Sequence, residues 1–354
     1  MTDKFLKDVK LSQYTTIGLG GPADLFISCK NTDDIVSALK YAKQNVIPVQ
    51  VFSGGSNIIF PDSGYKGMVI KADQKGIEFS ENENLIFVKT KAGEIWDDVV
   101  KFCIEKGLSG IESLSGIPGS AGAVPVQNVG AYGQEIKDML VSLKAIDRET
   151  LKECIFNNED CDFGYRQSRF KNKDKDRYII TEVLFGFTKD ADPEIKYPEL
   201  ENYIKTNHSF SPEDPVNEKL IFIRKAVLEL RKKKSMIIDI NDPDSRSCGS
   251  FFMNPVINRE ELDNFCNLLN DVNKEQIPVF KTGDKFKIPA AWLIERAGFK
   301  KGYIKGGAGI SKNHSLALIN INGTAAELLG LASEIKNKVY EISGISLSIE
   351  PVIV

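Results

Sequence analysis

Gly54 and Gly55 form a glycine pair directly after the apolar stretch at residues 46–52, and Ser56 and Asn57 follow them. Glycine adopts positive φ at little cost, so such a turn can present successive backbone N–H groups to an anion. The segment is therefore compatible with a phosphate-binding loop. A tight turn between two strands would use the same residues, so this segment alone does not distinguish a phosphate-binding loop from a tight turn.

A second glycine-rich segment spans residues 116–133 and carries no charge. Ordering so many glycines costs conformational entropy, so a packed domain keeps them where the backbone must approach something closely. The segment has neither the G-x-G-x-x-G dinucleotide pattern nor the Gly-Lys-Ser/Thr of a P-loop. Two phosphate-competent loops about sixty residues apart favour an extended diphosphate cofactor, with a structural glycine patch as the alternative.

Histidine and cysteine are arranged in a way that argues against several other chemistries. The chain has six cysteines without a C-x-x-C pair, and its two histidines are His208 and His314. Neither a zinc site nor a disulfide framework is indicated, so we expect no metal. Because catalytic triads need imidazole, we expect the general acid to be another side chain.

Composition limits the partners. With 354 residues, 46 Lys and Arg and 49 Asp and Glu, the chain has a formal charge of -3 and no basic surplus for nucleic acid. We find no secretion signal and no stretch of 18 apolar residues, so we expect a cytoplasmic protein without membrane insertion.

Alternating patterns predict the first half of the chain to be mixed helix and strand. We expect strands at 23–28, 46–52, 67–72, 85–91, 140–145 and 178–187, and helices at 35–42, capped by Thr32, and 93–106. Residues 157–176 look like a polar insertion, and 193–215 like irregular connecting structure.

The second half contains the clearest helix signals. We expect helices at 217–234, 258–272, 289–297 and 324–344, the last capped by Thr324 and Glu327 and ended by Gly344. Strands are expected at 314–321 and 346–354, and a polar hinge at 239–245. Phe251 and Phe252 should lie in a core.

Seven segments in order carry a resemblance to a known family. They are T-T-I-G-L-G-G-P-A at 15–23, G-G-S-N at 54–57, I-P-G-S-A-G-A at 117–123, Q-N-V-G-A-Y-G at 127–133, C-D-F-G-Y-R-Q-S at 161–168, G-S-F-F-M-N-P at 249–255 and I-E-P at 349–351. Each is weak alone, but together they resemble the UDP-N-acetylenolpyruvoylglucosamine reductase family over nearly the whole chain.

The resemblance implies an α+β fold, with a two-part FAD-binding domain of the vanillyl-alcohol-oxidase (PCMH) type and an α/β substrate-binding domain. The implied parts are residues 1–68, closed by 345–354, then 69–236 with a tyrosine-loop insertion, and 237–344. The implied cofactor-binding residues are Gly54, Gly55, Ser56, Asn57, Gly119, Ser120, Gly122, Ala123, Asn128, Gly130, Ala131 and Gly133. The flavin loops contain no histidine, so we expect non-covalent FAD.

The implied reaction is NADPH-dependent reduction of UDP-N-acetylglucosamine enolpyruvate to UDP-N-acetylmuramate, for peptidoglycan precursor synthesis. Hydride from flavin N5 to the enol ether leaves charge beside the substrate carboxylate, which Arg166 would offset with its bidentate cationic fork. Ser250 would donate the proton, and Glu350 would assist. Without the motifs, Arg166 would be read as a surface arginine and Ser250 as a turn cap.

Substrate contacts are implied for Tyr165, Tyr197, Lys234, Asn254 and His314. Lys234 cannot be separated by sequence from Lys232 and Lys233, and this cation run could equally complete a helix C-terminus.

The chain departs from the family pattern at two positions. Met253 stands where many members have lysine, and Val352 where an acidic residue is frequent. We expect these departures to affect substrate affinity more than reaction type. The sequence does not decide between NADPH and NADH, because it has no Rossmann switch residue, and a monomer is expected by analogy only.

Two rival interpretations remain at this stage. One is a flavin oxidase or dehydrogenase of the same fold with another substrate, and the other is a flavin- or nucleotide-binding module without turnover. The presence of Arg166, Ser250 and Glu350 together argues against both.

Overall fold

The computed structural model describes residues 4–207, 211, 213–269 and 277–354. Its chain forms two compact units. The first comprises Met1–Val9, Ala23–Gly55 and Lys66–Ile237, and the second comprises Lys10–Pro22, Ser56–Tyr65 and Ile238–Val354. Helices and largely antiparallel sheets occur in both, which agrees with the predicted α+β class.

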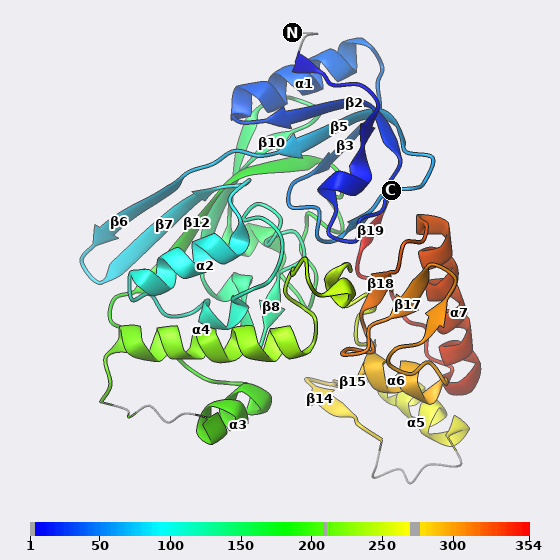
Figure 1. Ribbon diagram of the computed structural model, residues 1–354. Coiled ribbons are helices and arrows are strands. Elements are labelled where there is room, and N and C mark those ends of the chain that lie inside the picture. Colours follow the sequence, from blue (N-terminus) through cyan, green and yellow to red (C-terminus); the bar gives the residue numbers. More distant parts are fainter. Residues whose placement is uncertain (1–3, 208–210, 212, 270–276) are drawn as a thin grey trace. The chain divides into compact units, whose positions relative to one another are not determined.

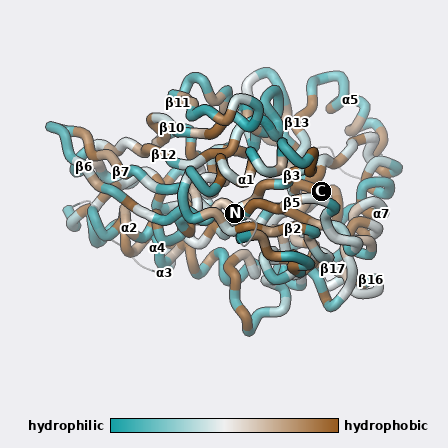
Figure 2. Tube along the Cα trace, turned by 90° about the horizontal axis from the view of Figure 1, so that it is seen from above, coloured by the Kyte–Doolittle hydropathy of each residue, from teal (hydrophilic) through white to brown (hydrophobic). Residues whose placement is uncertain are grey.

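The first unit begins with a small sheet in the order β1-β2-β5-β3 (Val9–Lys10, Pro22–Cys29, Tyr65–Ala72 and Val49–Phe52). Strand β3 runs parallel to β5, with Phe52 opposite Lys71. Helix α1 (Thr32–Gln44) buries Ile35 and Leu39 against this sheet, whose strands are hydrophobic in Figure 2. The helix is capped by the Asn31 side chain, so the prediction of Thr32 as the cap is wrong by one residue.

A five-stranded antiparallel sheet forms the rest of this unit's framework. Its order is β11-β10-β12-β7-β6 (Glu153–Asn157, Leu140–Asp147, Tyr178–Thr188, Leu85–Lys91 and Ile77–Asn82). Ile146 of β10 and Ile179 of β12 join the core beneath α1. The two sheets of the unit therefore share buried side chains.

Helices α2 (Trp96–Glu105) and α4 (Val216–Lys233) lie on one side of the five-stranded sheet (Figure 1). Trp96 is fully buried in the core between α2 and the sheet, and its ring packs on Phe185 of β12. Asp97 accepts two hydrogen bonds of 2.7 Å from Arg224 of α4 and one of 2.6 Å from the backbone N–H of Gly116. This carboxylate thus ties both helices to the start of the glycine-rich segment.

The prediction of irregular structure over residues 193–215 is wrong in part, because α3 (Pro198–Asn207) lies there. Leu200 and Ile204 are spaced four residues apart and are buried against α4, and Pro198 occupies the first turn, where its missing N–H costs nothing. Strand β6 was also not predicted, because all its residues but Ile77 are exposed and its apolar alternation is limited to Ile77 and Phe79.

The second unit contains short elements around one large core. They are β4 (Ile58–Ile59), β13 (Val256–Ile257), α5 (Arg259–Leu268), β14 (Phe280–Thr282), β15 (Lys285–Lys287), α6 (Ala290–Arg296), β16 (Ile304–Lys305), β17 (Ala308–Ile310), β18 (Leu318–Asn320), α7 (Ala325–Ser343) and β19 (Val352–Ile353). The helix predicted at 258–272 is α5, and its residues 270–272 lie outside the described residues.

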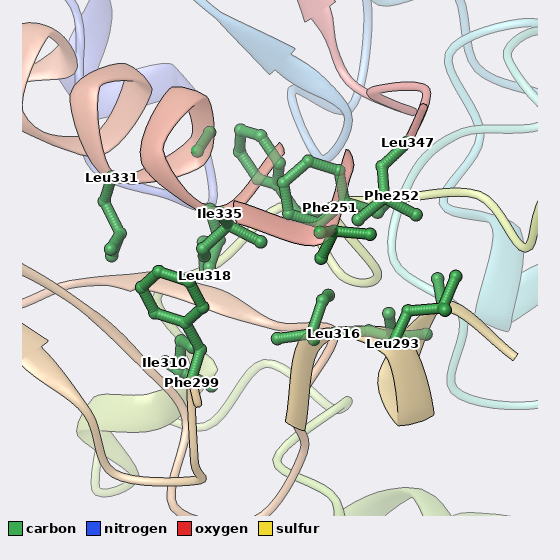
Figure 3. Packing of buried hydrophobic residues seen from close by; sticks show 14 of the residues in the cluster. Phe251, Phe252, Leu293, Phe299, Ile310, Leu316, Leu318, Leu331, Ile335 and Leu347 are labelled. Atoms are coloured by element: carbon green, nitrogen blue, oxygen red, sulfur yellow. The ribbon is translucent and has the colours of Figure 1, made fainter. Parts of the chain in front are cut away.

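Figure 3 shows how Phe251 and Phe252 pack in this core near Ile335 and Leu347. The two rings are 5.3 Å apart, and both side chains are almost fully buried, which confirms the core prediction. The closing strand is shorter than predicted: β19 has two residues and pairs in parallel with β4.

Helix α7 follows its predicted boundaries. Thr324 and Glu327 form a capping box, and Gly344 ends the helix with a φ of 68°. The carboxylate of Asp62 accepts hydrogen bonds from the N–H groups of Ala325 and Ala326, which satisfies two further donors of the first turn.

None of the described helices is long and apolar enough to cross a membrane.

Replacing Asp97 tests the tie between α2, α4 and the glycine-rich segment. Burial alone would raise the pKa of Asp97, but the hydrogen bonds from Arg224 and the Gly116 N–H outweigh it and hold the pKa below its usual range. We expect Asp97→Asn to lower the free energy of unfolding by about 1–3 kcal/mol at pH 7. Urea denaturation at neutral pH measures this loss.

The loss should depend on pH in a defined direction. A depressed folded-state pKa stabilises the protein above the unfolded-state value of about 4, and this contribution disappears as the pH falls further. The difference between wild type and Asp97→Asn should therefore be constant from pH 5 to 7 and shrink below pH 4. A difference that stays unchanged down to pH 3 would contradict the assignment.

Candidate functional site

The two glycine-rich loops meet backbone to backbone in the first unit. A Cβ placed on Gly54 would lie 2.7 Å from the Cα of Gly119, which is closer than real Cβ contacts come. Gly119 itself has a φ of 131° and Gly55 one of 65°, so both loops also use conformations that favour glycine. The two loops that the sequence predicts to bind one diphosphate cofactor are thus in direct contact, although Gly54 and Gly119 lie 65 positions apart in the chain.

The second loop is held from its other side by residues 92–96. The N–H of Gly122 donates to Ala92, that of Ala121 donates to Glu94, and that of Trp96 donates to Gly119, at 2.8, 2.9 and 3.1 Å. A Cβ on Gly122 would lie 2.5 Å from that of Ala92. The N–H of Ala123 donates to the backbone carbonyl of Ser120 at 2.9 Å and so closes the loop.

Ser120 is the polar side chain of this contact. It is buried, and its Oγ has no hydrogen-bond partner in the described structure. Buried hydroxyls are normally satisfied, so an unmet Oγ between two glycine loops fits a polar ligand such as the diphosphate of FAD. The loops therefore fit the cofactor that the sequence predicts.

Asn128 uses its side chain within the protein. Its Nδ2 donates to Glu135 and to the carbonyl of Gly164, both at 3.1 Å, and its Oδ1 accepts from the N–H of Lys137 at 3.0 Å. Its φ is 47°. Asn128 thereby connects the glycine-rich segment to the inserted loop at residues 157–176. The next part of the segment is strand β8 (Gly130–Ala131), which pairs with β9 (Gln134–Glu135). Gly133, in the turn between these strands, has a φ of 88°.

Arg166 lies at the end of a tight hairpin in that insertion. Gly164 and Gln167 exchange two backbone hydrogen bonds of 3.0 and 3.1 Å, which leaves Tyr165 and Arg166 as the two turn residues. Arg166 has a φ of 54°, a strained conformation for a side chain of this size. Its guanidinium is 5.7 Å from the Tyr165 ring.

Carbonyl groups of the glycine-rich segment orient the Arg166 side chain. Nη2 donates to Gly130 at 2.6 Å and Nη1 to Asn128 at 3.5 Å. Lys171 donates to the Arg166 carbonyl at 3.1 Å, and the Ser168 hydroxyl donates to that of Val126. The predicted carboxylate-binding arginine is therefore held by the predicted cofactor-binding segment.

A second cluster surrounds Tyr132, which also belongs to the glycine-rich segment. Tyr197 packs edge-on against its ring at 5.6 Å, and the Lys234 ammonium lies 5.8 Å from the ring centre. Lys234 also pairs with Glu199 at 2.7 Å. Two predicted substrate residues thus meet here, whereas Lys233 lies over Tyr203 and Lys232 is exposed.

Burial shifts the ionisation of the neighbouring groups. It raises the pKa of Tyr132 to about 12 and lowers the pKa of Arg231 to about 10. Electrostatic attraction to Tyr132 and Asp97 raises the pKa of Arg231, but by less than burial lowers it. Arg231 donates from Nη2 to the Met236 carbonyl at 2.8 Å, and its buried Nε has no partner in the described structure. The cluster thus holds two cations beside two aromatic rings.

The second unit pairs the segment that carries Ser250 with the segment that carries Glu350, although the two residues lie one hundred positions apart in the chain. The N–H of Glu350 donates to the carbonyl of Phe251 at 2.9 Å, and Phe252 and Ile349 form an adjacent antiparallel bridge. Asn57 joins them, because its Nδ2 donates to the Glu350 carbonyl at 3.4 Å. Asn57 and Ser56 of the first glycine loop belong to this unit.

Asn254 and His314 lie close to this pair in the fold. The Oδ1 of Asn254 accepts from the N–H of Ala290 at 2.9 Å and so caps α6. His314 lies in the loop that leads to Leu316, whose carbonyl accepts from the N–H of Phe251 at 2.7 Å. Both predicted substrate residues therefore border the segment that carries Ser250.

Sequence reasoning missed three members of the Tyr132 cluster as site residues: Tyr132, Glu199 and Arg231. Tyr132 stood inside a quoted motif, and Arg231 within the basic run, so both carried a signal. Glu199 carried none, because α3 was not predicted. Among the described residues there is no group of three or more His, Cys, Asp or Glu side chains that could hold a metal ion.

Comparisons with known proteins cover both units. The family model for the UDP-N-acetylenolpyruvoylglucosamine reductase C-terminal domain matches residues 242–354, and the model for an FAD binding domain matches residues 23–150. The second match confirms the predicted FAD-binding domain.

Whole-chain relatives agree with these matches. The UDP-N-acetylenolpyruvoylglucosamine reductase of Thermobifida fusca is 41% identical over all of this chain and 99% of its own, and that of Streptomyces avermitilis is 39% identical over 99% and 94%. The crystal structure of the Thermus caldophilus enzyme superposes with a TM-score of 0.64 over 99% of both chains, at 22% identity, and so shares the fold.

Gly54→Ala tests the contact between the two glycine loops. The added methyl would lie 2.7 Å from Gly119 Cα, so the loops must separate, and we expect FAD affinity to fall by about tenfold or more. Flavin fluorescence titration of the apoprotein measures this change. Gly330→Ala is the matched control, because a Cβ there meets nothing within 4 Å and α7 gains helix propensity. Equal FAD affinity in both variants would contradict the expected role of the contact.

Proposed function

The chain belongs to the UDP-N-acetylenolpyruvoylglucosamine reductase family, and from that membership we propose that it reduces UDP-N-acetylglucosamine enolpyruvate to UDP-N-acetylmuramate with NADPH. The observation that carries the proposal is the backbone pairing of the segment that carries Ser250 with the segment that carries Glu350, through the hydrogen bond from the Glu350 N–H to the Phe251 carbonyl. A module that only binds a nucleotide has no need of this pair, whereas a reduction that ends in proton delivery does.

FAD, when bound, supplies the hydride for such a reduction. The residues that would hold its diphosphate are those of the two touching glycine loops, with the Ser120 hydroxyl as a side-chain partner. No histidine occurs in either loop to tether the flavin, so we propose non-covalent binding.

We propose that Arg166 binds the substrate carboxylate. Its guanidinium is half-buried, and the carbonyl oxygens of Gly130 and Asn128 orient it, so little reorganisation is needed when negative charge increases on the substrate. The strained φ of 54° supports a functional role, since such conformations persist where the surrounding structure enforces them. Lysine could not replace the planar fork.

Ser250 is proposed to hold and deliver the proton, and Glu350 to assist it. The backbone of both residues is fixed by the pairing of 251 with 350 and by the packing of Phe251 and Phe252 in the core. A hydroxyl is a weak acid, but a carbanion beside a carboxylate is a strong base, so the transfer is favourable once the hydroxyl is positioned.

The Tyr132 cluster is proposed to bind the uridine diphosphate part of the substrate. Lys234 and Arg231 supply positive charge, and Tyr197 and Tyr132 supply rings on which a base can stack. Lys234 would exchange its ion pair with Glu199 for a phosphate. Tyr165, Asn254 and His314 are the further proposed substrate contacts.

The division of the chain into parts, its location in the cell and its oligomeric state also belong to the proposal. We retain the division into residues 1–68 with 345–354, 69–236 and 237–344, a cytoplasmic location and a monomeric state. The boundary between the two compact units at Ile237 and Ile238 supports the start of the third part, whereas the same units group residues 345–354 with 238–344 and residues 23–55 with 66–237.

The proposed roles predict severe losses in two variants. Arg166→Ala and Ser250→Ala should slow reoxidation of the reduced enzyme by UDP-N-acetylglucosamine enolpyruvate by about two to four orders of magnitude, as loss of a charge stabiliser or general acid usually does. Arg259→Ala and Ser80→Ala are matched controls, because both residues are exposed. A wild-type rate in either active-site variant would refute its assigned role.

The overall reaction is best tested by anaerobic stopped-flow absorbance on the holoprotein. NADPH should bleach the bound flavin, and addition of the enolpyruvyl nucleotide should restore the oxidised spectrum. Flavin that is reduced but not reoxidised by this nucleotide would indicate another oxidoreductase. Failure to bind FAD at all would contradict the proposed function itself.

A further inference from the structure

Gln74 is a buried side chain whose hydrogen-bonding capacity is unused. It is 3% exposed, and neither Oε1 nor Nε2 has a partner in the described structure. Gln134 shows the usual arrangement, because it is also buried but accepts from Ser113 and donates to Glu112, both at 2.8 Å. An amide left without partners at both ends is costly, so it is expected where a ligand completes the bonding.

The sheet places Gln74 beside the first glycine loop. Strands β3 and β5 are parallel neighbours, with Phe52 opposite Lys71, so the chain leaves both strands at the same edge of the sheet. Gly54 follows β3 and Gln74 follows β5 by two residues each. The Ser53 hydroxyl joins the two exits by donating to the Ala72 carbonyl at 2.6 Å.

The segment at residues 92–96 places Gln74 close to the second glycine loop as well. The N–H of Gly93 donates to the Gln74 carbonyl at 3.0 Å, and a Cβ on Gly93 would lie 2.6 Å from the Gln74 nitrogen. The same segment pairs with residues 119–122, which include the buried Ser120. The backbone of residues 92–96 therefore connects Gln74 with Ser120, and both residues carry buried side-chain polar atoms that have no partner in the described structure.

We propose that Gln74 is a further FAD-binding residue, whose Nε2 donates to an acceptor of the dinucleotide and whose Oε1 accepts from a neighbouring donor. The inference rests on the proposed function, since it takes FAD as the ligand. The flavin and adenosine halves of FAD both offer such a donor and acceptor pair, in their ring edges and sugar hydroxyls. A structural role does not account for Gln74, because no described protein group satisfies either end of the amide.

Gln74→Leu removes the hydrogen-bonding groups and puts an apolar side chain of similar size in their place. We expect the dissociation constant for FAD, measured by flavin fluorescence on apoprotein prepared by chaotrope dialysis, to rise about 10- to 100-fold. Thermal unfolding supplies a second readout. The apoprotein of the variant should be as stable as wild type or more so, because a buried amide without partners has been removed, whereas stabilisation by FAD should be smaller.

Controls separate a ligand contact from general damage. Gln50→Leu changes the same residue type on β3, where Nε2 already donates to the Val51 carbonyl at 3.0 Å, and should leave FAD affinity unchanged. Gln74→Met keeps the length of the side chain and also loses both hydrogen-bonding groups, so it replaces Gln74→Leu if that variant fails to fold. Weaker binding of FMN would assign the contact to the flavin half of FAD, and weaker binding of ADP with unchanged FMN would assign it to the adenosine half.

The outcomes distinguish this inference from the proposed function. Wild-type FAD affinity in the Gln74 variants, or an apoprotein destabilised as much as the FAD complex, would overturn the role of Gln74 and leave the proposed function standing. A wild-type protein that binds no FAD would overturn both.

Discussion

The backbone of Gly54 lies against that of Gly119, and this contact sets the distance between two loops that belong to different sheets and helices of the first unit. A Cβ on Gly54 does not fit there, which explains why this position is glycine. The entropic cost of ordering glycines must be offset, and the hydrogen bonds between the second loop and residues 92–96 do so in part. A ligand bound across the loops would contribute the rest.

The glycine-rich segment at 116–133 serves three structural tasks at once. Its start is fixed by Asp97, its middle contacts the first loop, and its end supplies the carbonyl oxygens that hold Arg166. Carbonyl groups are dipoles that cannot lose a proton, so they orient a guanidinium without competing for its charge. The arginine proposed to bind substrate is consequently positioned by the segment proposed to bind the cofactor.

Much of the fold could be predicted because helix caps and apolar spacing are local signals. Helix α7 follows Thr324, Glu327 and Gly344 as expected, and most strands of the large sheet lie where apolar runs occur. The exceptions are exposed or short elements. Strand β6 and helix α3 bury few residues, so their patterns are weak, and their positions are decided by pairing with β7 and packing on α4.

The sequence by itself determined the family, since seven ordered motifs carry the resemblance and predict which residues bind a diphosphate, bind a carboxylate and donate a proton. Only the tertiary structure decided which of these residues meet. It paired the segment of Ser250 with that of Glu350, held Arg166 with backbone carbonyls and used Asn128 internally. It also left the Gln74 side chain buried without a partner among the described residues. Hydrogen bonding between residues far apart in the chain depends on distances that folding creates, so motif spacing cannot reveal it.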